Sequence, residues 1–164
     1  MEVRRLRVGE EHAIRELRLR ALRDAPYAFS SSLAEEEHDP PEHWDGLAAR
    51  SEAATDSVVF VAVAADALVG MIGGYMSDGD PPAAGVWGMW VAPEARHGGV
   101  ASRLLDAVTG WARGRGAARL ELSVSDRASA AAAFYRRRGF LPTGETRPLP
   151  SDGSATEVFL LKPL

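Results

Sequence analysis

The chain has 164 residues, 46% of them hydrophobic, which predicts one domain, residues 1–164, with a globular core. Its formal net charge of −4 gives no electrostatic support for a nucleic-acid partner. It contains no cysteine, and none of its four histidines belongs to an H-E-x-x-H pattern, which excludes disulfides, thiol catalysis and cysteine-bound zinc and leads us to expect no metal. No apolar run is long enough for a membrane span and no signal-peptide segment is seen, so we expect no membrane partner and a cytoplasmic protein.

The N-terminal third predicts one strand and two helices. Residues 2–8 alternate apolar residues with arginines, as in an edge strand, and residues 10–22 place apolar side chains on one helical face. A second helix is expected to begin at residues 40–41, with Trp44 buried against the core. Between the helices lies the acidic run Glu35 to Asp39, which is either a solvated loop or a surface that attracts cations.

Three strands follow and predict an antiparallel meander. Residues 58–64 and 68–76 are typical of a hairpin, and the strand at residues 86–91 comes next. Gly73 and Gly74 interrupt the second of these strands, which indicates a bulge or a close backbone approach.

A strand, a glycine-bearing loop and a helix are expected over residues 86–112. Pro93 ends the strand because it has no N–H to donate. The helix carries an apolar stripe made by Ala101, Leu104, Leu105, Val108 and Trp111 or Ala112. Backbone N–H groups at such a helix start attract an anion and glycines let it approach, so the segment predicts an anion-binding loop with Arg96 at its mouth. The alternative is a plain strand-to-helix turn.

The C-terminal third alternates strands with one helix. Residues 119–124 predict a strand, Asp126 the cap of a helix that ends at Gly139, and residues 140–146 and 156–161 the last two strands. Because a strand, a helix and a strand form a crossover unit, the strands before and after the anion-binding loop and its helix should run parallel.

Two segments resemble motifs of the GNAT superfamily of acyl-CoA-dependent N-acetyltransferases. Residues 91–101 fit V-x-P-E-x-R-x-x-G-x-A, like the family's pyrophosphate loop, and residues 131–140 fit A-x-x-F-Y-x-x-x-G-F. The two matches are correctly ordered and spaced. The resemblance implies an α/β (α+β) fold: a GNAT-like mixed, mostly antiparallel seven-stranded sheet with a central parallel strand pair, flanked by about four helices.

The resemblance also implies acetyl-CoA as the co-substrate. The pyrophosphate would lie on the backbone N–H groups of the loop, and the pantetheine arm would pair like an added strand where the parallel strands separate. A backbone N–H of that strand would act on the thioester oxygen. The cofactor-binding residues expected on this basis are Met89, Trp90, Val91, Arg96, His97, Gly98, Gly99, Val100, Ala101 and Ser102.

Tyr135 matches the tyrosine that acts as a general acid near the CoA sulfur in this family; the alternative is an aromatic core residue beside Phe134. The general base is open, because residues 85–89 contain no Glu and Ser123 stands where other members carry one. Glu121, on the same strand face as Ser123, is the candidate base. An exposed charge at Glu121, an amine that enters neutral, or a base that acts through water are the alternatives.

We predict an enzyme, an acetyl-CoA-dependent N-acetyltransferase that moves an acetyl group by direct transfer to a primary amine of a small molecule. In the family the region before the second strand covers the acceptor site, so Glu35 to Asp39 would attract a cationic amine.

Two alternatives remain open at this point. A protein or peptide acetyltransferase, acting on an N-terminus or a lysine, would need an open groove at residues 27–45. A non-catalytic acyl-CoA-binding module is mildly favoured by Ala128, where many members carry Asn, and is disfavoured by Tyr135. The sequence does not name the acceptor or the acyl-chain preference, and it leaves open whether the protein is a homodimer.

Overall fold

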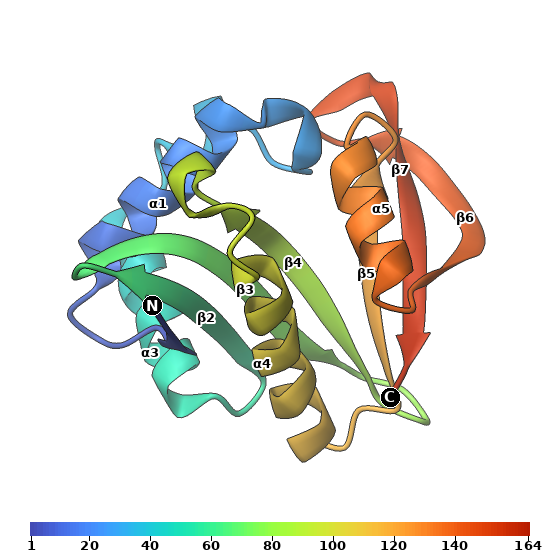
Figure 1. Ribbon diagram of the computed structural model, residues 1–164, viewed down its shortest axis with the longest axis horizontal. Coiled ribbons are helices and arrows are strands. Elements are labelled where there is room, and N and C mark those ends of the chain that lie inside the picture. The colour runs from blue at the N-terminus through green and yellow to red at the C-terminus, as the bar shows by residue number, and fades with distance from the viewer.

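The computed structural model describes all residues, 1–164, and contains one sheet with helices on both faces (Figure 1). Seven strands lie in the order β1-β2-β3-β4-β5-β7-β6. Their bounds are Glu2–Arg5 (β1), Ser57–Ala64 (β2), Ala67–Ser77 (β3), Ala83–Val91 (β4), Arg119–Ser125 (β5), Leu141–Leu149 (β6) and Asp152–Pro163 (β7). The helices are Glu11–Asp24 (α1), Leu33–Glu36 (α2), Pro41–Ala53 (α3), Val100–Gly114 (α4) and Ser129–Arg137 (α5), with short 3₁₀ turns at Pro26–Ala28 (η1) and Pro93–Ala95 (η2).

β4 and β5 are the parallel neighbours of the sheet, and they pair over a short distance. Registered pairs join Ala84 to Leu120 and Gly85 to Glu121, and no pairing continues beyond them. Toward their carboxyl ends the two strands separate, which Figure 1 shows as a wedge between β4 and β5. All other neighbouring strands are antiparallel, so the structure confirms the predicted mixed sheet with a central parallel pair.

Helices α1 and α3 pack on one face of the sheet, and α4 packs on the other face against β2, β3 and β4. The stripe of α4 that faces the sheet consists of Val100, Leu104, Leu105, Val108, Thr109 and Ala112, all buried. Burying one leucine side chain of this kind contributes about 1.5–3 kcal/mol. This packing fixes the start of α4 beside the wedge between β4 and β5.

The adjacent glycines of β3 allow close packing on both faces. A Cβ at Gly74 would lie 2.6 Å from Val108 of α4, and a Cβ at Gly73 would lie 2.0 Å from the Trp87 ring. The register between β3 and β4 also shifts between Met71 and Gly73. The bulge and the close approach that the sequence indicates are therefore both present.

Four helices of nine or more residues agree with the prediction of about four, and a fifth, the four-residue α2, begins where Ser32 and Glu35 form a capping box. One local prediction is corrected. Asp126 does not cap α5; its Oδ1 accepts a hydrogen bond from the backbone N–H of Thr156 at 3.1 Å, and the helix begins at Ser129. None of the helices has the length and apolar character that crossing a membrane requires.

Candidate active site

The wedge between β4 and β5 holds a small cavity of about 70 Å³. Trp87, Gly88 and Met89 line it from β4, Ser123 from β5 and Tyr135 from α5. Beyond its short pairing with β5, β4 has no strand partner on this side. An extended ligand could therefore pair with the β4 backbone as an additional strand.

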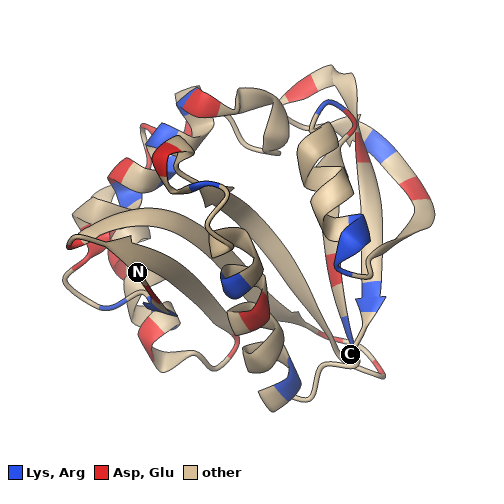
Figure 2. Ribbon diagram, viewed as in Figure 1, with Lys and Arg blue, Asp and Glu red and all other residues tan.

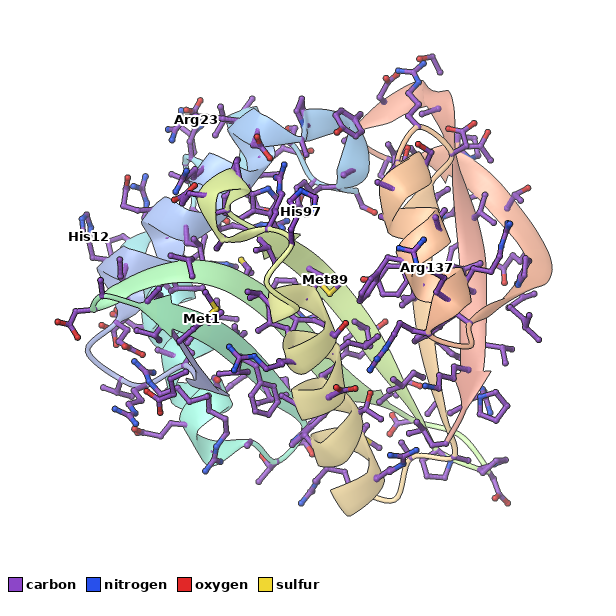
Figure 3. The ribbon with its side chains drawn as sticks, in the orientation of Figure 1. Met1, His12, Arg23, Met89, His97 and Arg137 are labelled. Atoms are coloured by element: carbon purple, nitrogen blue, oxygen red, sulfur yellow. The ribbon has the colours of Figure 1, made fainter.

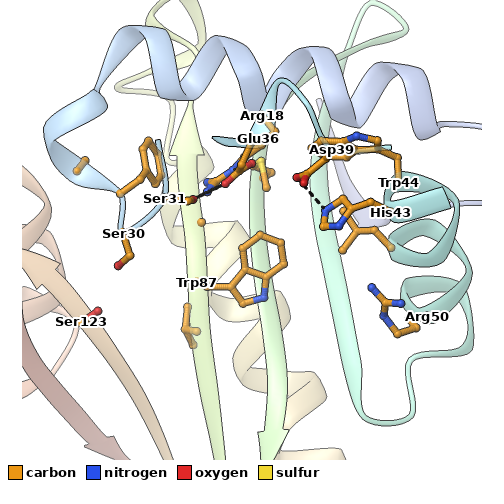
Figure 4. A pocket seen from close by; sticks show the side chains of 16 residues that line it. Arg18, Ser30, Ser31, Glu36, Asp39, His43, Trp44, Arg50, Trp87 and Ser123 are labelled. Carbon is orange, nitrogen blue, oxygen red and sulfur yellow. Dashed lines mark hydrogen bonds and ion pairs between the residues drawn. The ribbon is translucent and has the colours of Figure 1, made fainter. Parts of the chain in front are cut away.

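Two larger cavities meet the small one from opposite faces of the sheet. The α3-side cavity, about 460 Å³, shares Trp87, Gly88 and Ser123 with it (Figure 4). The α4-side cavity, about 380 Å³, shares Met89 and Ala131 with it. Because the three cavities have lining residues in common, two molecules that enter from different faces can meet at the strand gap.

The start of α4 offers free backbone donors beside the α4-side cavity, which Arg96 and Ala101 line. Gly99 adopts a left-handed φ of 73°, and no side chain caps the helix. The backbone N–H groups of Val100, Ala101 and Ser102 make no hydrogen bond within the chain. Free N–H groups and the positive end of the helix dipole favour an anion at this place.

Met89, Trp90 and Val91 line the same α4-side cavity. Figure 3 shows Met89 on β4, His97 in the loop before α4 and Arg137 on α5. Just before Met89, Gly88 has a φ of 63°, and the register between β3 and β4 shifts beside it. The strand residues expected to bind the donor therefore follow directly after an irregularity in β4.

Arg96 is held by an aspartate of α1 that sequence analysis did not consider. Its Nη2 donates to Asp24 at 2.6 Å and its Nε to the Val91 carbonyl at 2.9 Å, while Trp90 Nε1 donates to Asp24 at 2.9 Å. The hydrogen bonds from Trp90 and Arg96 hold the pKa of Asp24 below its ordinary value, although burial opposes them. A second ion pair joins α1 to η2, and charged residues gather where α1 meets this loop (Figure 2).

Tyr135 packs its ring in the core while its hydroxyl remains without a partner. The side chain is 6% exposed and lies edge-on to Phe134 and Phe140, with ring centroids 5.4 and 5.3 Å away. No side-chain hydrogen bond within the chain involves the hydroxyl, and it is not among the fully buried polar atoms that lack a partner, so it remains accessible at the small cavity that the residue lines. Burial raises the pKa of Tyr135 above its ordinary value, so the phenol is protonated at neutral pH and can donate to a leaving group.

A buried ion pair lies along the α3-side cavity, where α1 meets α2 (Figure 4). Arg18 is 6% exposed and donates to Glu36 through Nε at 2.8 Å and through Nη2 at 2.6 Å. Ser31 forms hydrogen bonds with both side chains. Burial alone would raise the pKa of Glu36, but the hydrogen bond and charge of Arg18 outweigh it and hold that pKa below its ordinary value. Arg18 therefore compensates the charge of Glu36.

The acidic run does not form one charged surface. Glu35 caps α2, Glu36 is paired with α1, and Glu37 lies outside the α3-side cavity. Asp39 lines this cavity, with Oδ2 3.7 Å from Nε2 of His43. Asp39 is therefore the carboxylate of this run that lines the cavity and has no short ion pair, so a cationic ligand could pair with it.

Two glutamates lie on the sheet face that carries Ser123. Glu121 pairs with an arginine of its own strand at 2.6 Å and is not among the residues that line the three cavities. Glu157 of β7 is 1% exposed and accepts hydrogen bonds from Ser123, from Ser30 at 2.8 Å and from Arg147 at 2.6 Å. Sequence analysis missed Glu157, since one charged residue in an alternating strand is typical of a solvent-facing position.

The model of the acetyltransferase (GNAT) family matches residues 13–140. The chain belongs to this family. This confirms the resemblance carried by the two motifs and makes the protein an acetyl-CoA-dependent acyltransferase. A comparison with curated protein sequences found no significant match.

Solved structures of other GNAT acetyltransferases have the same fold. PaiA N-acetyltransferase from Thermoplasma acidophilum, solved in complex with coenzyme A, is 20% identical, with a TM-score of 0.79 over 99% of this chain and 98% of that chain. The ribosomal-protein-alanine N-acetyltransferase from Brucella melitensis is 20% identical, with a TM-score of 0.78 over 100% of both chains. Nourseothricin acetyltransferase is 32% identical, but the match covers 66% of this chain and 65% of that one, with a TM-score of 0.61.

Proposed function

We propose that this acetyltransferase moves the acetyl group of acetyl-CoA directly onto the primary amine of a small molecule. The observation that carries the proposal is the meeting of two large cavities at the β4–β5 gap, one on each face of the sheet. The donor would occupy the α4-side cavity and the amine the α3-side cavity. Holding both reactants at one gap turns a bimolecular reaction into a reaction within one complex.

The donor would be held mainly by backbone groups. Its pyrophosphate would accept hydrogen bonds from the loop and first turn of α4, over residues 96–102, and its pantetheine arm would pair with β4 at residues 89–91. Arg96 is already bonded to Asp24 and to the Val91 carbonyl. We therefore expect Arg96 to fix the shape of the loop more than to neutralise the phosphates.

The reaction would need one proton donor and one proton acceptor. The amine nitrogen bonds the acetyl carbon, the C–S bond breaks, and the CoA thiolate takes the hydroxyl proton of Tyr135. A backbone N–H of β4 beside Gly88 would polarise the thioester carbonyl in a gap with little water. The amine proton must leave the nitrogen in the same step or directly after it.

A small acceptor is favoured by the residues that cover the α3-side cavity. Eight of its lining residues belong to the segment 27–45, which the peptide-acetyltransferase alternative requires to be open: Ala28, Phe29, Ser30, Ser31, Glu36, Asp39, His43 and Trp44. Nourseothricin acetyltransferase, which has a similar fold, is named for a small-molecule acceptor. We propose a small amine with a second positive charge, which Asp39 would attract.

The test is thiol release from acetyl-CoA with a panel of small amines, lysine peptides and peptides with free N-termini. Small amines, and dibasic ones most, should give the highest kcat/KM. A preference for peptides would establish the protein acetyltransferase alternative. Acetyl-CoA binding without turnover of any amine would establish the non-catalytic alternative.

A further inference from the structure

The proposed reaction lacks an assigned group that removes the amine proton, and Glu157 has the position for it. The carboxylate lies on β7, beneath the serines at one end of the α3-side cavity; Figure 4 shows Ser30 and Ser123 at this end and Asp39 at the other. A carboxylate as buried as this one is costly unless it is well hydrogen-bonded. Glu157 meets this requirement through three hydrogen-bond donors.

Two of these partners connect Glu157 to the cavities. Ser123 and Ser30 both donate their hydroxyl hydrogens to Oε1 of Glu157. Each hydroxyl then has only lone pairs to offer to the cavity, so both act as hydrogen-bond acceptors there. Because they share one carboxylate oxygen, the two hydroxyls lie close together, and a primary amine could donate one N–H to each. Ser123 lines both the α3-side cavity and the small cavity at the strand gap.

The third partner, Arg147, helps the two serines to keep the carboxylate ionised. Arg147 Nε donates to Oε2 of Glu157 at 2.6 Å. Burial alone would raise the pKa of Glu157, but the hydrogen bonds from Ser123, Arg147 and Ser30 outweigh it and hold that pKa below its ordinary value. A weak base of this kind is sufficient once the C–N bond begins to form, because the nitrogen then becomes positive and its N–H acidic.

We propose that Ser123 takes the amine proton as the C–N bond forms and passes its own hydroxyl proton to Glu157, while Ser30 holds the second N–H. This inference rests on the proposed function. The C–S bond breaks, the thiolate takes the proton of Tyr135, and water later removes the proton from Glu157 and restores that of Tyr135, so the protons balance. Ser123 is a catalytic residue in this scheme, and Glu157, which acts through it, is a positioning residue.

The test compares Ser123→Ala and Glu157→Gln with Ser123→Thr, which keeps the hydroxyl. Ser125→Ala is the matched control, because Ser125 is buried on the same strand but makes no hydrogen bond to Glu157. The first two variants should lose about 10²-fold in kcat/KM for an alkylamine, and the double variant should be no worse than either. The loss should shrink for a weakly basic amine such as hydroxylamine. Acetyl-CoA affinity should not change. Ser123→Thr should recover most of the activity that Ser123→Ala loses, and the control variant should stay near full activity.

Three results would overturn the relay. Full kcat/KM in Ser123→Ala or Glu157→Gln would show that the relay does not operate. A loss of the same size for amines of every basicity would show that the two residues have a structural role instead. Loss of activity in Glu121→Gln with full activity in Glu157→Gln would assign the base to Glu121. These results presuppose that the unmodified protein acetylates an amine; if it acetylates none, the proposed function is wrong and the relay with it.

Discussion

Tyr135→Phe should lower kcat while leaving the fold at least as stable. The phenyl ring keeps its contacts with Phe134 and Phe140. The hydroxyl makes no side-chain hydrogen bond in the chain but is accessible at the small cavity, so its removal costs no hydrogen bond and should raise the free energy of unfolding by at most about 1 kcal/mol. Loss of a general acid should cost about 10²-fold in kcat, which is about 2.7 kcal/mol of transition-state stabilisation.

Opposite changes in stability and rate distinguish a general acid from a packing residue. Denaturant unfolding gives the first quantity, and thiol release at saturating amine and acetyl-CoA gives the second. The affinity for acetyl-CoA should be unchanged, and an acetyl donor with a more acidic leaving thiol should recover much of the lost rate. Tyr75→Phe, at an exposed position of β3, is the control and should change neither quantity. A Phe variant with full kcat, in an assay limited by the chemical step, would refute the reasoning.

Three further outcomes are expected. Gly98→Asp should abolish the rise in melting temperature that acetyl-CoA causes, because it places a negative charge where the pyrophosphate would bind. Gly98→Ala should keep the rise, since the nearest atom to a Cβ there is 3.9 Å away. An equal rise with ATP or NAD would contradict the assignment of the loop to acetyl-CoA. Gly74→Ala should destabilise by about 1–3 kcal/mol through overpacking against α4, while Gly110→Ala, with nothing within 4 Å, should stabilise by up to about 1 kcal/mol in chemical denaturation. Asp39→Asn should raise KM for a dibasic amine while Glu37→Gln should not; equal effects on KM would show that Asp39 does not attract the amine.

The elements around the site could be predicted because their signals act over a few residues. Pro93 ends β4, a glycine at the αL position precedes α4, and apolar residues at helical spacing mark the face that α4 buries. The handedness and spacing of a crossover then require β4 and β5 to be parallel. The extent of their pairing, which stops after Gly85 and Glu121, depends on contacts between distant segments and has no local signal.

The partners of the site residues could not be predicted for the same reason. Asp24 and Arg96 are separated by 72 residues, and Ser30 and Glu157 by 127. Alternation along one strand favours Glu121 as a base because it shares a face with Ser123. The register between β5 and β7 brings a second carboxylate, that of Glu157, to the same face from the neighbouring strand. Glu121 stays a prediction, as do the donor-binding residues and Tyr135, until variants are measured.

In the proposed reaction two buried groups have opposite tasks: Tyr135 lines the gap between β4 and β5, and Glu157 reaches it through Ser123. Tyr135 is packed among aromatic rings, and burial raises its pKa, so it stays protonated at neutral pH. Burial also makes it a weaker acid, but the same surroundings would disfavour the charged thiolate and raise the pKa of the CoA thiol, so the thiolate would be basic enough to take the proton. Glu157 is buried as well, but three donors hold it ionised, so it is free to accept the proton that the amine must lose. Without those donors burial would raise its pKa and favour the protonated form, which has no charge to attract a proton. Direct transfer would therefore depend on the hydrogen bonds around Glu157 as much as on the carboxylate itself.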